Sequence, residues 1–230
     1  MMLKYWDQRY RIFSRYDHGI VIDNEGWYST TFERIAQYIA KKFTKFHITT
    51  IIDCFSGIGG TTIPFARGAN RVIAIDNNPD KFRILQINAA IYNTNNNIEM
   101  ITGDVYETTK DLAATRKLDR ETTGIICSPP WGGPEYVHRK HCSIRTFPSG
   151  DMFELMKVLV QITNNIVLIL PRNTDMKEIK GDALTHSLTH SLTHSLTHSL
   201  TLITTPYFLL LRAAQDARFV LPRRGGVLTR

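Results

Sequence analysis

The sequence predicts an α/β fold, in which helices cover both faces of a mostly parallel sheet and a small N-terminal helical arm precedes it. From about residue 49 onward, short apolar runs alternate with stretches of helical spacing, a pattern typical of βαβ units. A glycine-rich turn, Ser56 to Gly60, follows the first apolar run, as it does in sheets that bind nucleotides. We therefore expect the ligand-binding residues at the carboxyl ends of the strands.

The arm is expected to span residues 1–45 and to act as a lid. Residues 4–16 form a short helix or helix-turn in which basic and aromatic side chains alternate. Such side chains can contact phosphates and stack on bases, or they can pack the helix against the domain. A second helix is predicted to have its cap at Ser29, Thr30 or Thr31 and to run to Phe43.

The main domain is expected to span residues 46–211. Its predicted strands are 51–52 leading into Asp53, 71–75, 98–101, 123–127, 165–170 and 204–211. Helices are predicted between them: a short one that ends near residue 67, one at 80–92, a helix and loop at 106–122, and one at 151–162. Residues 185–200 repeat Thr-His-Ser-Leu four times. Histidines at this spacing can ligate a metal from a helix, but we favour a simple repeat in a surface loop because no acidic residue accompanies them. The tail, 212–230, is expected to be loose.

Composition limits the class of protein. The formal net charge of +7 and the pI of about 9.4 favour an anionic partner. The three cysteines Cys54, Cys127 and Cys142 do not form a C-x-x-C pair, which predicts a reduced, intracellular compartment and no metal site. No apolar run reaches the ~18 to 20 residues of a membrane span, and the first residues lack the apolar core of a signal peptide. We expect a monomer that does not associate with membranes.

The glycine turn distinguishes between nucleotide ligands. No lysine occupies it, so the phosphate-loop motif is absent. Gly57 and Gly59 are followed by Gly60 and not by a glycine at position 62, so the G-x-G-x-x-G dinucleotide motif is absent too. A methyl-donor site is the remaining interpretation of this turn.

Acidic residues end three predicted strands in succession: Asp53, Asp76 and Asp104. Asp76 can accept both ribose hydroxyls, Asp53 can take the ammonium of a methionyl group, and Asp104 can reach an adenine amine. Each aspartate alone fits a helix cap or turn, but together they suit S-adenosylmethionine, a nucleoside without phosphates. The sequence therefore predicts a Rossmann-like class I methyltransferase sheet that leaves S-adenosylhomocysteine as product. The predicted cofactor-binding set also includes Gly57, Gly59, Thr61 and Thr62 of the turn, and Asn77 and Val105, which follow Asp76 and Asp104.

The tetrad Ser128-Pro129-Pro130-Trp131 follows the strand 123–127 and supplies the predicted catalytic residues. The Ser128 hydroxyl and the Pro129 carbonyl can accept the hydrogens of an exocyclic amine while its ring stacks on Trp131. A proline-rich turn with a packing tryptophan fits the tetrad alone equally well. Together with the donor, the tetrad predicts methyl transfer to an amine, driven by orientation and without a dedicated general base.

Several segments resemble the trimethylguanosine synthase family, whose members dimethylate the N2 amine of a 7-methylguanosine RNA cap. The resemblance rests on Lys4 to Arg15, Glu25 to Ser29, the glycine turn, Ser128 to Tyr136, and Asn164 to Asn173. It implies hypermethylated cap synthesis on small nuclear and nucleolar RNAs, an intracellular enzyme, and the nucleus before the cytoplasm as its compartment. A 7-methylated guanine is cationic, so stacking on Trp131 gains ~1 to 2 kcal/mol over plain guanine.

The same resemblance implies roles for individual residues. Tyr28, Ser29 and Thr31 reach over the donor, and Trp131 stacks the base. Lys4, Tyr136 and Arg172 hold the cap phosphates, and Phe13 and Asn88 complete the base pocket. Thr61 stands where the family often has Asn. The repeat tract and tail lie where the family has a final helix and paired strands, which leaves Thr205 to Phe208 as the expected remnant. Two alternatives stay open: a methyltransferase for an internal RNA or DNA base amine, and an inactive cap-binding protein.

Overall fold

The computed structural model describes residues 3–69, 71–171, 173–175, 178, 200–204 and 208–213. For residues 3, 4, 137 and the last two of these ranges it describes the backbone only. The repeat tract apart from Leu200, the tail beyond Ala213, and Arg172 lie outside the described residues.

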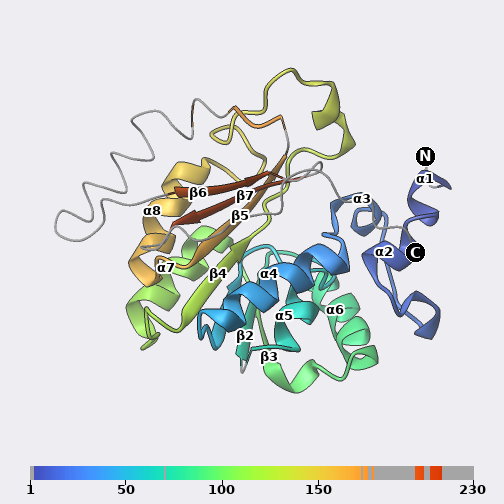
Figure 1. The fold of residues 1–230 in the computed structure, drawn as a ribbon, viewed down its shortest axis with the longest axis horizontal. Helices are drawn as coiled ribbons and strands as arrows, with labels where there is room; N and C mark the ends of the chain where they lie inside the picture. The colour runs from blue at the N-terminus through green and yellow to red at the C-terminus, as the bar shows by residue number, and fades with distance from the viewer. Residues whose placement is uncertain are drawn as a thin grey trace.

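A seven-stranded sheet forms the centre of the molecule, in the order β3-β2-β1-β4-β5-β7-β6 (Figure 1). Five strands run parallel: β1 Thr50–Asp53, β2 Arg71–Asp76, β3 Ile98–Thr102, β4 Thr123–Cys127 and β5 Ile166–Pro171. The strand order reverses at β1, which pairs with both β2 and β4. In such a sheet this reversal opens a crevice at the carboxyl edge, where ligands bind.

Helices cover both faces of the sheet because neighbouring strand residues point to opposite sides. In β1, Ile51 packs in the cluster that contains Ile39 of α4, whereas Ile52 packs in the cluster that contains Leu159 of α8. The helices next to the sheet are α4 Glu33–Lys45, α5 Thr62–Ala66, α6 Pro79–Ile91, α7 Val105–Thr115 and α8 Met152–Ile162, with short 3-10 turns η2 Asn95–Asn97 and η3 Pro134–His138. The predicted α/β fold is confirmed.

The arm consists of short pieces: α1 Leu3–Trp6, α2 Arg9–Ile12, the 3-10 turn η1 Tyr16–His18, and α3 Gly26–Ser29. It packs against α4 and α6 through a buried carboxylate, Glu33. This side chain accepts hydrogen bonds from the Ser14 hydroxyl at 3.0 Å and from the Tyr92 hydroxyl at 2.8 Å. Because a buried carboxylate is costly without such donors, these bonds fix the arm in one position on the domain.

Two predicted features of secondary structure differ from those observed. None of the suggested caps begins the second helix: Ser29 belongs to α3, and α4 begins at Glu33 after Phe32, which forms no side-chain cap. The last strand, predicted at 204–211, is instead two antiparallel strands, β6 Leu200–Thr204 and β7 Phe208–Ala213. Paired strands are therefore present after the repeat tract, and β7 continues the sheet next to β5.

Among the helices that the structure describes, none has the length and apolar character needed to cross a membrane.

Candidate functional site

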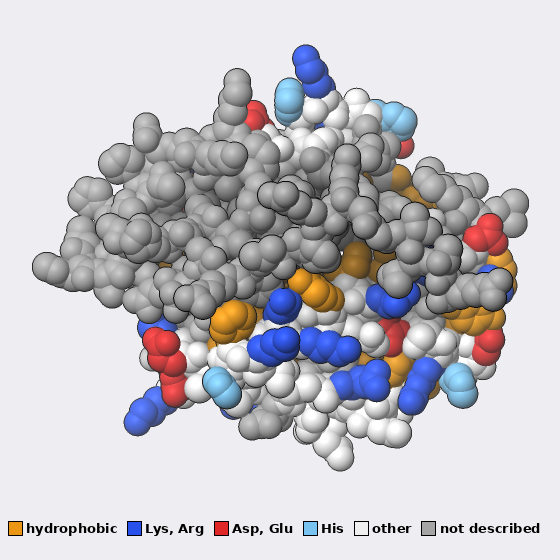
Figure 2. All heavy atoms as spheres, in the orientation of Figure 1, with side chains coloured by type: hydrophobic (Ala, Val, Ile, Leu, Met, Phe, Trp, Pro, Cys, Tyr) orange, Lys and Arg blue, Asp and Glu red, His pale blue; other side chains and the backbone are white. Residues whose placement is uncertain are grey.

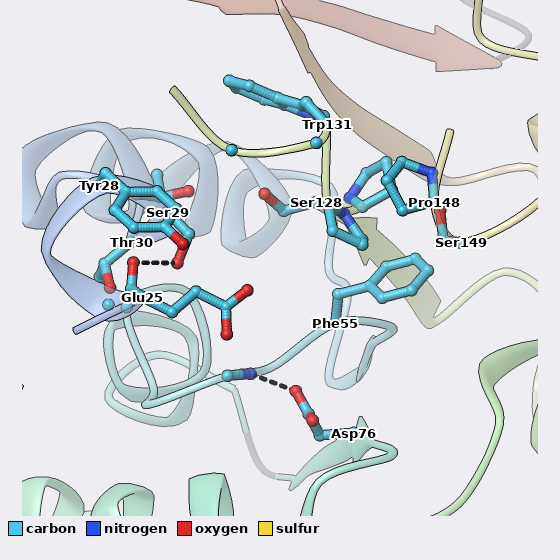
Figure 3. A pocket seen from close by; sticks show the side chains of 18 of the residues that line it. Glu25, Tyr28, Ser29, Thr30, Phe55, Asp76, Ser128, Trp131, Pro148 and Ser149 are labelled. Carbon is cyan, nitrogen blue, oxygen red and sulfur yellow. Dashed lines mark hydrogen bonds between the residues drawn. The ribbon is translucent and has the colours of Figure 1, made fainter. Parts of the chain in front are cut away.

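A cleft of about 1470 Å³ lies along the carboxyl edge of the sheet (Figure 3). The arm forms one wall, the glycine turn and the ends of β2 and β3 form the floor, and the segment after β4 forms the opposite wall. Many of the predicted site residues line it: Tyr28, Ser29, Thr31, Gly57, Thr61, Asp76, Asn77, Asp104, Val105, Ser128, Pro129, Pro130, Trp131 and Tyr136. The predicted donor half and the predicted tetrad thus open into one space.

Asp76 joins the second strand to the glycine turn. Its two carboxylate oxygens accept the Gly57 amide at 2.9 Å and the Asn78 amide at 3.0 Å. Gly57 has a φ of 51°, which glycine adopts without strain, and this turn directs its N–H to Asp76. Burial raises the pKa of Asp76, and the two amides oppose that rise. Each oxygen keeps a lone pair, so Asp76 can still accept two hydroxyls of a ribose.

Asp53 lies beneath the lining of the cleft. Its side chain is buried, and one oxygen accepts the hydroxyls of Thr61 at 2.6 Å and Thr62 at 2.7 Å. The other oxygen, Oδ1, makes no hydrogen bond to the described residues. Burial raises the pKa of Asp53 to about 6, although the hydroxyls of Thr61 and Thr62 and the backbone of Phe55 lower it. The carboxylate therefore holds the turn in shape.

Asp104 begins α7 as its N-cap. Its Oδ1 accepts the amides of Tyr106 at 2.9 Å and Glu107 at 3.1 Å. Asp104 is therefore a helix cap, as an aspartate at this position would be without any ligand, and it also lines the cleft. The second oxygen accepts no hydrogen bond from the described residues, so it can still face a ligand amine.

The tetrad occupies the wall after β4. The Ser128 hydroxyl points into the open space between Trp131 and Phe55 (Figure 3), and no described residue hydrogen-bonds to it. Tyr136 packs edge-on against Trp131, with ring centroids 5.2 Å apart and planes at 85°. Such a contact limits the orientation of the indole. A hydroxyl acceptor and an oriented aromatic face therefore stand together, as a planar amine requires.

Among the charged side chains of the described lining, carboxyl groups outnumber basic groups. The carboxyl residues there are Glu25, Asp76, Asp104, Glu135, Asp151 and Glu154, against the basic residues Lys81 and His138. Lys81 is already engaged by Asp23 at 2.6 Å and by Glu25 at 2.7 Å. Asp151 pairs with Arg145 at 3.2 Å and Glu154 pairs with Lys157 at 2.7 Å, so Asp76, Asp104 and Glu135 remain to attract a cationic ligand. Among the described residues there is no group of three or more His, Cys, Asp or Glu side chains that could hold a metal ion.

Some predicted residues do not reach the cleft. Phe13 is 1% exposed and packs against Tyr92, so the structure places it in the core beneath the arm. Asn88 is fully buried, where it accepts the Val21 amide and donates to the carbonyls of Val21 and Ile58. These positions contradict the predicted role of both residues in the base pocket.

Two residues of the predicted donor set also lie behind the surface of the cleft. Thr62 is buried on Asp53, and Gly59 contacts the core side chains of Leu85 and Ile63 with a φ of 99°. Both shape the turn from behind. The side chain of Lys4, and Arg172 as a whole, lie outside the described residues, so their predicted contact with phosphates is not tested.

Four residues of the cleft were not predicted as site residues from the sequence. Glu25 and Lys81 form an ion pair between the arm and α6, while Phe55 and Pro148 flank the space below Trp131 (Figure 3). Lys81 belongs to no sequence motif, because its role depends on the arm folding back onto α6. Glu25 precedes Tyr28 and Ser29 in the segment that resembles the family, so its position beside them could have identified it.

The arm approaches the glycine turn closely, which explains how it closes the cleft. A side chain at Gly60 would collide with Thr30, and one at Gly26 would lie 2.6 Å from Ile58. Glycine at both places lets the backbone of α3 lie over the turn. Tyr28 and Ser29 are thereby brought to the cleft from a part of the chain that precedes the sheet.

The fold and the cleft define the class: this is a Rossmann-like class I methyltransferase. An O-methyltransferase from Bacillus cereus, solved in complex with S-adenosylhomocysteine, has a similar fold, with a TM-score of 0.51 and 12% identity over 80% of this chain and 83% of that one. At this identity the similarity concerns the fold alone.

Sequence relatives give the family. The chain is 38% identical over 186 residues to the trimethylguanosine synthase of Schizosaccharomyces pombe, covering 80% of this chain and 76% of the relative. It is 32% identical over 184 residues to the trimethylguanosine synthase of Saccharomyces cerevisiae, covering 77% of this chain but only 57% of that relative. The profile of the RNA cap guanine-N2 methyltransferase family matches residues 48–205. The chain belongs to this family and is an RNA cap guanine-N2 methyltransferase.

Proposed function

We propose that this protein transfers methyl groups from S-adenosylmethionine to the N2 amine of 7-methylguanosine at the 5′ end of RNA. The products would be hypermethylated caps on small nuclear and nucleolar RNAs. The observation that carries the proposal is the continuity of the cleft, since Asp76 and Asp104 open into the same space as Ser128 and Trp131. The family supports the N2 amine as the methyl acceptor.

The residues of the cleft fit the proposed donor. Asp76 has lone pairs for the ribose hydroxyls, and Asp104 has an oxygen left for the adenine amine. The open space beside Gly57 leaves room for the ligand next to the turn. The buried Asp53 has an oxygen without a hydrogen bond, and an ammonium group near Thr61 would lower the electrostatic cost of its charge. When bound, S-adenosylmethionine supplies an electrophilic methyl group.

The chain's own residues would act mainly by orientation. The Ser128 hydroxyl and the Pro129 carbonyl accept hydrogens of the N2 amine and so aim its nitrogen toward the donor half of the cleft. An aryl-type amine is nearly neutral before attack and loses its proton afterwards, so Ser128 need only hold the amine. The arm residues Tyr28 and Ser29 exclude water from the donor side.

Trp131 would select the 7-methylated base. Methylation makes the guanine cationic, and a cation over an indole face gains ~1 to 2 kcal/mol. The acidic lining adds attraction of the same sign. We therefore propose that 7-methylation precedes N2 methylation, and that Lys4, Tyr136 and Arg172 hold the cap phosphates.

The test is mass spectrometry of 7-methyl-GTP after incubation with the protein and S-adenosylmethionine. The proposal expects one or two added methyl groups on 7-methyl-GTP and none on GTP. Equal transfer to both nucleotides would contradict selection by Trp131, and transfer only to uncapped RNA would indicate an internal base as substrate. Calorimetry with S-adenosylmethionine distinguishes the enzyme, which must bind this donor, from an inactive cap-binding protein, which need not bind the donor.

We also propose the organisation of the chain. Residues 1–45 act as a lid for the methyltransferase domain at 46–211, the protein is a monomer, and it works without a metal and away from membranes. Its compartment is proposed to be the nucleus first and the cytoplasm second. Gel filtration with light scattering tests the oligomeric state, since a dimer of 26.3 kDa chains is readily resolved from a monomer.

A further inference from the structure

The outer face of α4 carries a row of cations. Arg34, Lys41 and Lys45 are exposed and Lys42 is half-buried beside them, whereas Ala36, Ile39, Ala40 and Phe43 on the opposite side are buried in the core. We call these four cations the α4 basic face. Figure 2 shows Lys and Arg side chains gathered in a row across this side of the molecule, over the positions of α4 and α5 in Figure 1.

Seven described cations form ion pairs with carboxylates, and three cations of the α4 basic face are not among them. Within the described part of the chain, Arg34, Lys41 and Lys45 take part in no ion pair. The cations that do are Arg71, Lys81, Arg83, Lys110, Arg116, Arg145 and Lys157. The one carboxylate of α4, Glu33, is buried and already accepts Ser14, Gln37 and Tyr92. Arg34, Lys41 and Lys45 therefore carry positive charge that no described carboxylate pairs with.

The charge on the helix itself does not explain this row. Lys42 and Lys45 lie in the last turn, where cations interact favourably with the helix dipole. Arg34 lies in the first turn, where the dipole disfavours a cation. A role in helix stability thus accounts for one end of the row and not for the other, which points to an external anion.

The row starts at the cleft. Thr30, Thr31 and Phe32 line the cleft and lead directly into α4. The guanidinium of Arg11 lies over the Phe32 ring at 4.7 Å and extends the positive charge toward the arm. From Arg34 to Lys45 the helix rises about 16 Å at ~1.5 Å per residue. A chain that leaves the cleft at Phe32 can follow the row for several phosphates.

We propose that the α4 basic face binds the RNA chain that follows the cap, through its phosphates and without regard to sequence. This inference rests on the proposed function. RNA fits better than an acidic protein because the row begins beside the cleft that is proposed to take the cap. The phosphates of a single strand that leaves the cleft can follow such a row of exposed cations.

The experiment compares two triple variants of the full chain. One is Arg34→Gln/Lys41→Gln/Lys45→Gln, which neutralises three cations of the α4 basic face. The matched control is Arg71→Gln/Arg83→Gln/Lys110→Gln, which removes the same charge from cations that lie outside α4 and already pair with carboxylates. Anisotropy of labelled, 7-methylguanosine-capped RNA of about 20 nucleotides gives the binding constant, and methylation of 7-methyl-GTP gives the activity of the site.

The first variant should bind capped RNA at least about tenfold more weakly than the control at about 50 mM salt. Its plot of log affinity against log salt should be shallower by about 2, because each lost phosphate contact on a single strand contributes about 0.7. Both variants should methylate 7-methyl-GTP as the wild type does. Equal RNA binding by the two variants would overturn the α4 proposal. Absence of methylation of 7-methyl-GTP by the wild type would instead overturn the proposed function.

Discussion

The buried carboxylate of Asp53 makes a prediction about stability. In Asp53→Asn the amide oxygen can take the place of Oδ2 and accept the hydroxyls of Thr61 and Thr62 as before. The amide nitrogen takes the place of Oδ1, which has no hydrogen-bond partner among the described residues. The substitution therefore removes the titration of this group and keeps the hydrogen bonds that Thr61 and Thr62 donate.

The magnitude follows from the pKa. Burial raises the pKa of Asp53 from 3.8 to about 6 in the folded protein. Between these values the folded state binds more protons than the unfolded state, so the free energy of unfolding falls as pH rises. About two pH units at ~1.4 kcal/mol each give about 3 kcal/mol. Relative to Asp53→Asn, the wild type should lose about 2 kcal/mol of this stability between about pH 4 and pH 7.

Urea unfolding of both proteins at several pH values in this range measures the difference directly, since other titrating groups cancel. A difference that stays constant within about 1 kcal/mol, or that grows in favour of the wild type, would refute the reasoning. Saturating S-adenosylmethionine should reduce the pH dependence, because a positive charge near Thr61 favours the ionised carboxylate. An unchanged slope with the donor bound would place its ammonium away from Asp53.

The other predictions concern the walls of the cleft. Trp131→Ala should weaken binding of 7-methyl-GTP at least about thirtyfold, through lost stacking and cation–π energy, while calorimetry finds donor affinity unchanged. Ser128→Ala should lower kcat about tenfold with little change in cap affinity, as expected for one lost hydrogen bond. Lys81→Met should raise KM for the donor, by a factor about fivefold to tenfold larger than the factor by which kcat falls, because Asp23 and Glu25 no longer anchor the arm. Lys81→Arg should largely restore the KM.

Lys81 shows why the arm is held so firmly. Burial lowers its pKa, but the hydrogen bonds to Asp23 and Glu25 outweigh burial and leave the pKa above its usual value. The ammonium is thus charged at all physiological pH values. A KM for the donor that does not respond to Lys81→Met would mean that Glu33 and Asn88 alone fix the arm.

Local patterns in the sequence were sufficient for the five parallel strands of the sheet. Short apolar runs became β1 to β5 with ends within one or two residues of those predicted, because strands buried between layers of helices are rich in apolar residues. The helix after Phe32 was predicted correctly, but its cap was not. Three hydroxyl residues in a row suggested a cap, and contact of Thr30 with Gly60 placed them elsewhere.

The sequence alone determined the Rossmann-like sheet, the strand-end carboxylates and the tetrad, since these depend on hydrophobicity and spacing along short stretches. Only the tertiary structure decided which carboxylates open into the cleft: Asp76 and Asp104 do, whereas Asp53 is covered by Thr61. Tertiary packing also placed Phe13 and Asn88 in the core and set the exposed cations of α4 apart from the carboxylates of the described residues. The exposure of a side chain and the pairing of its charge depend on segments that are distant in sequence, and a local sequence pattern does not show which segments come into contact.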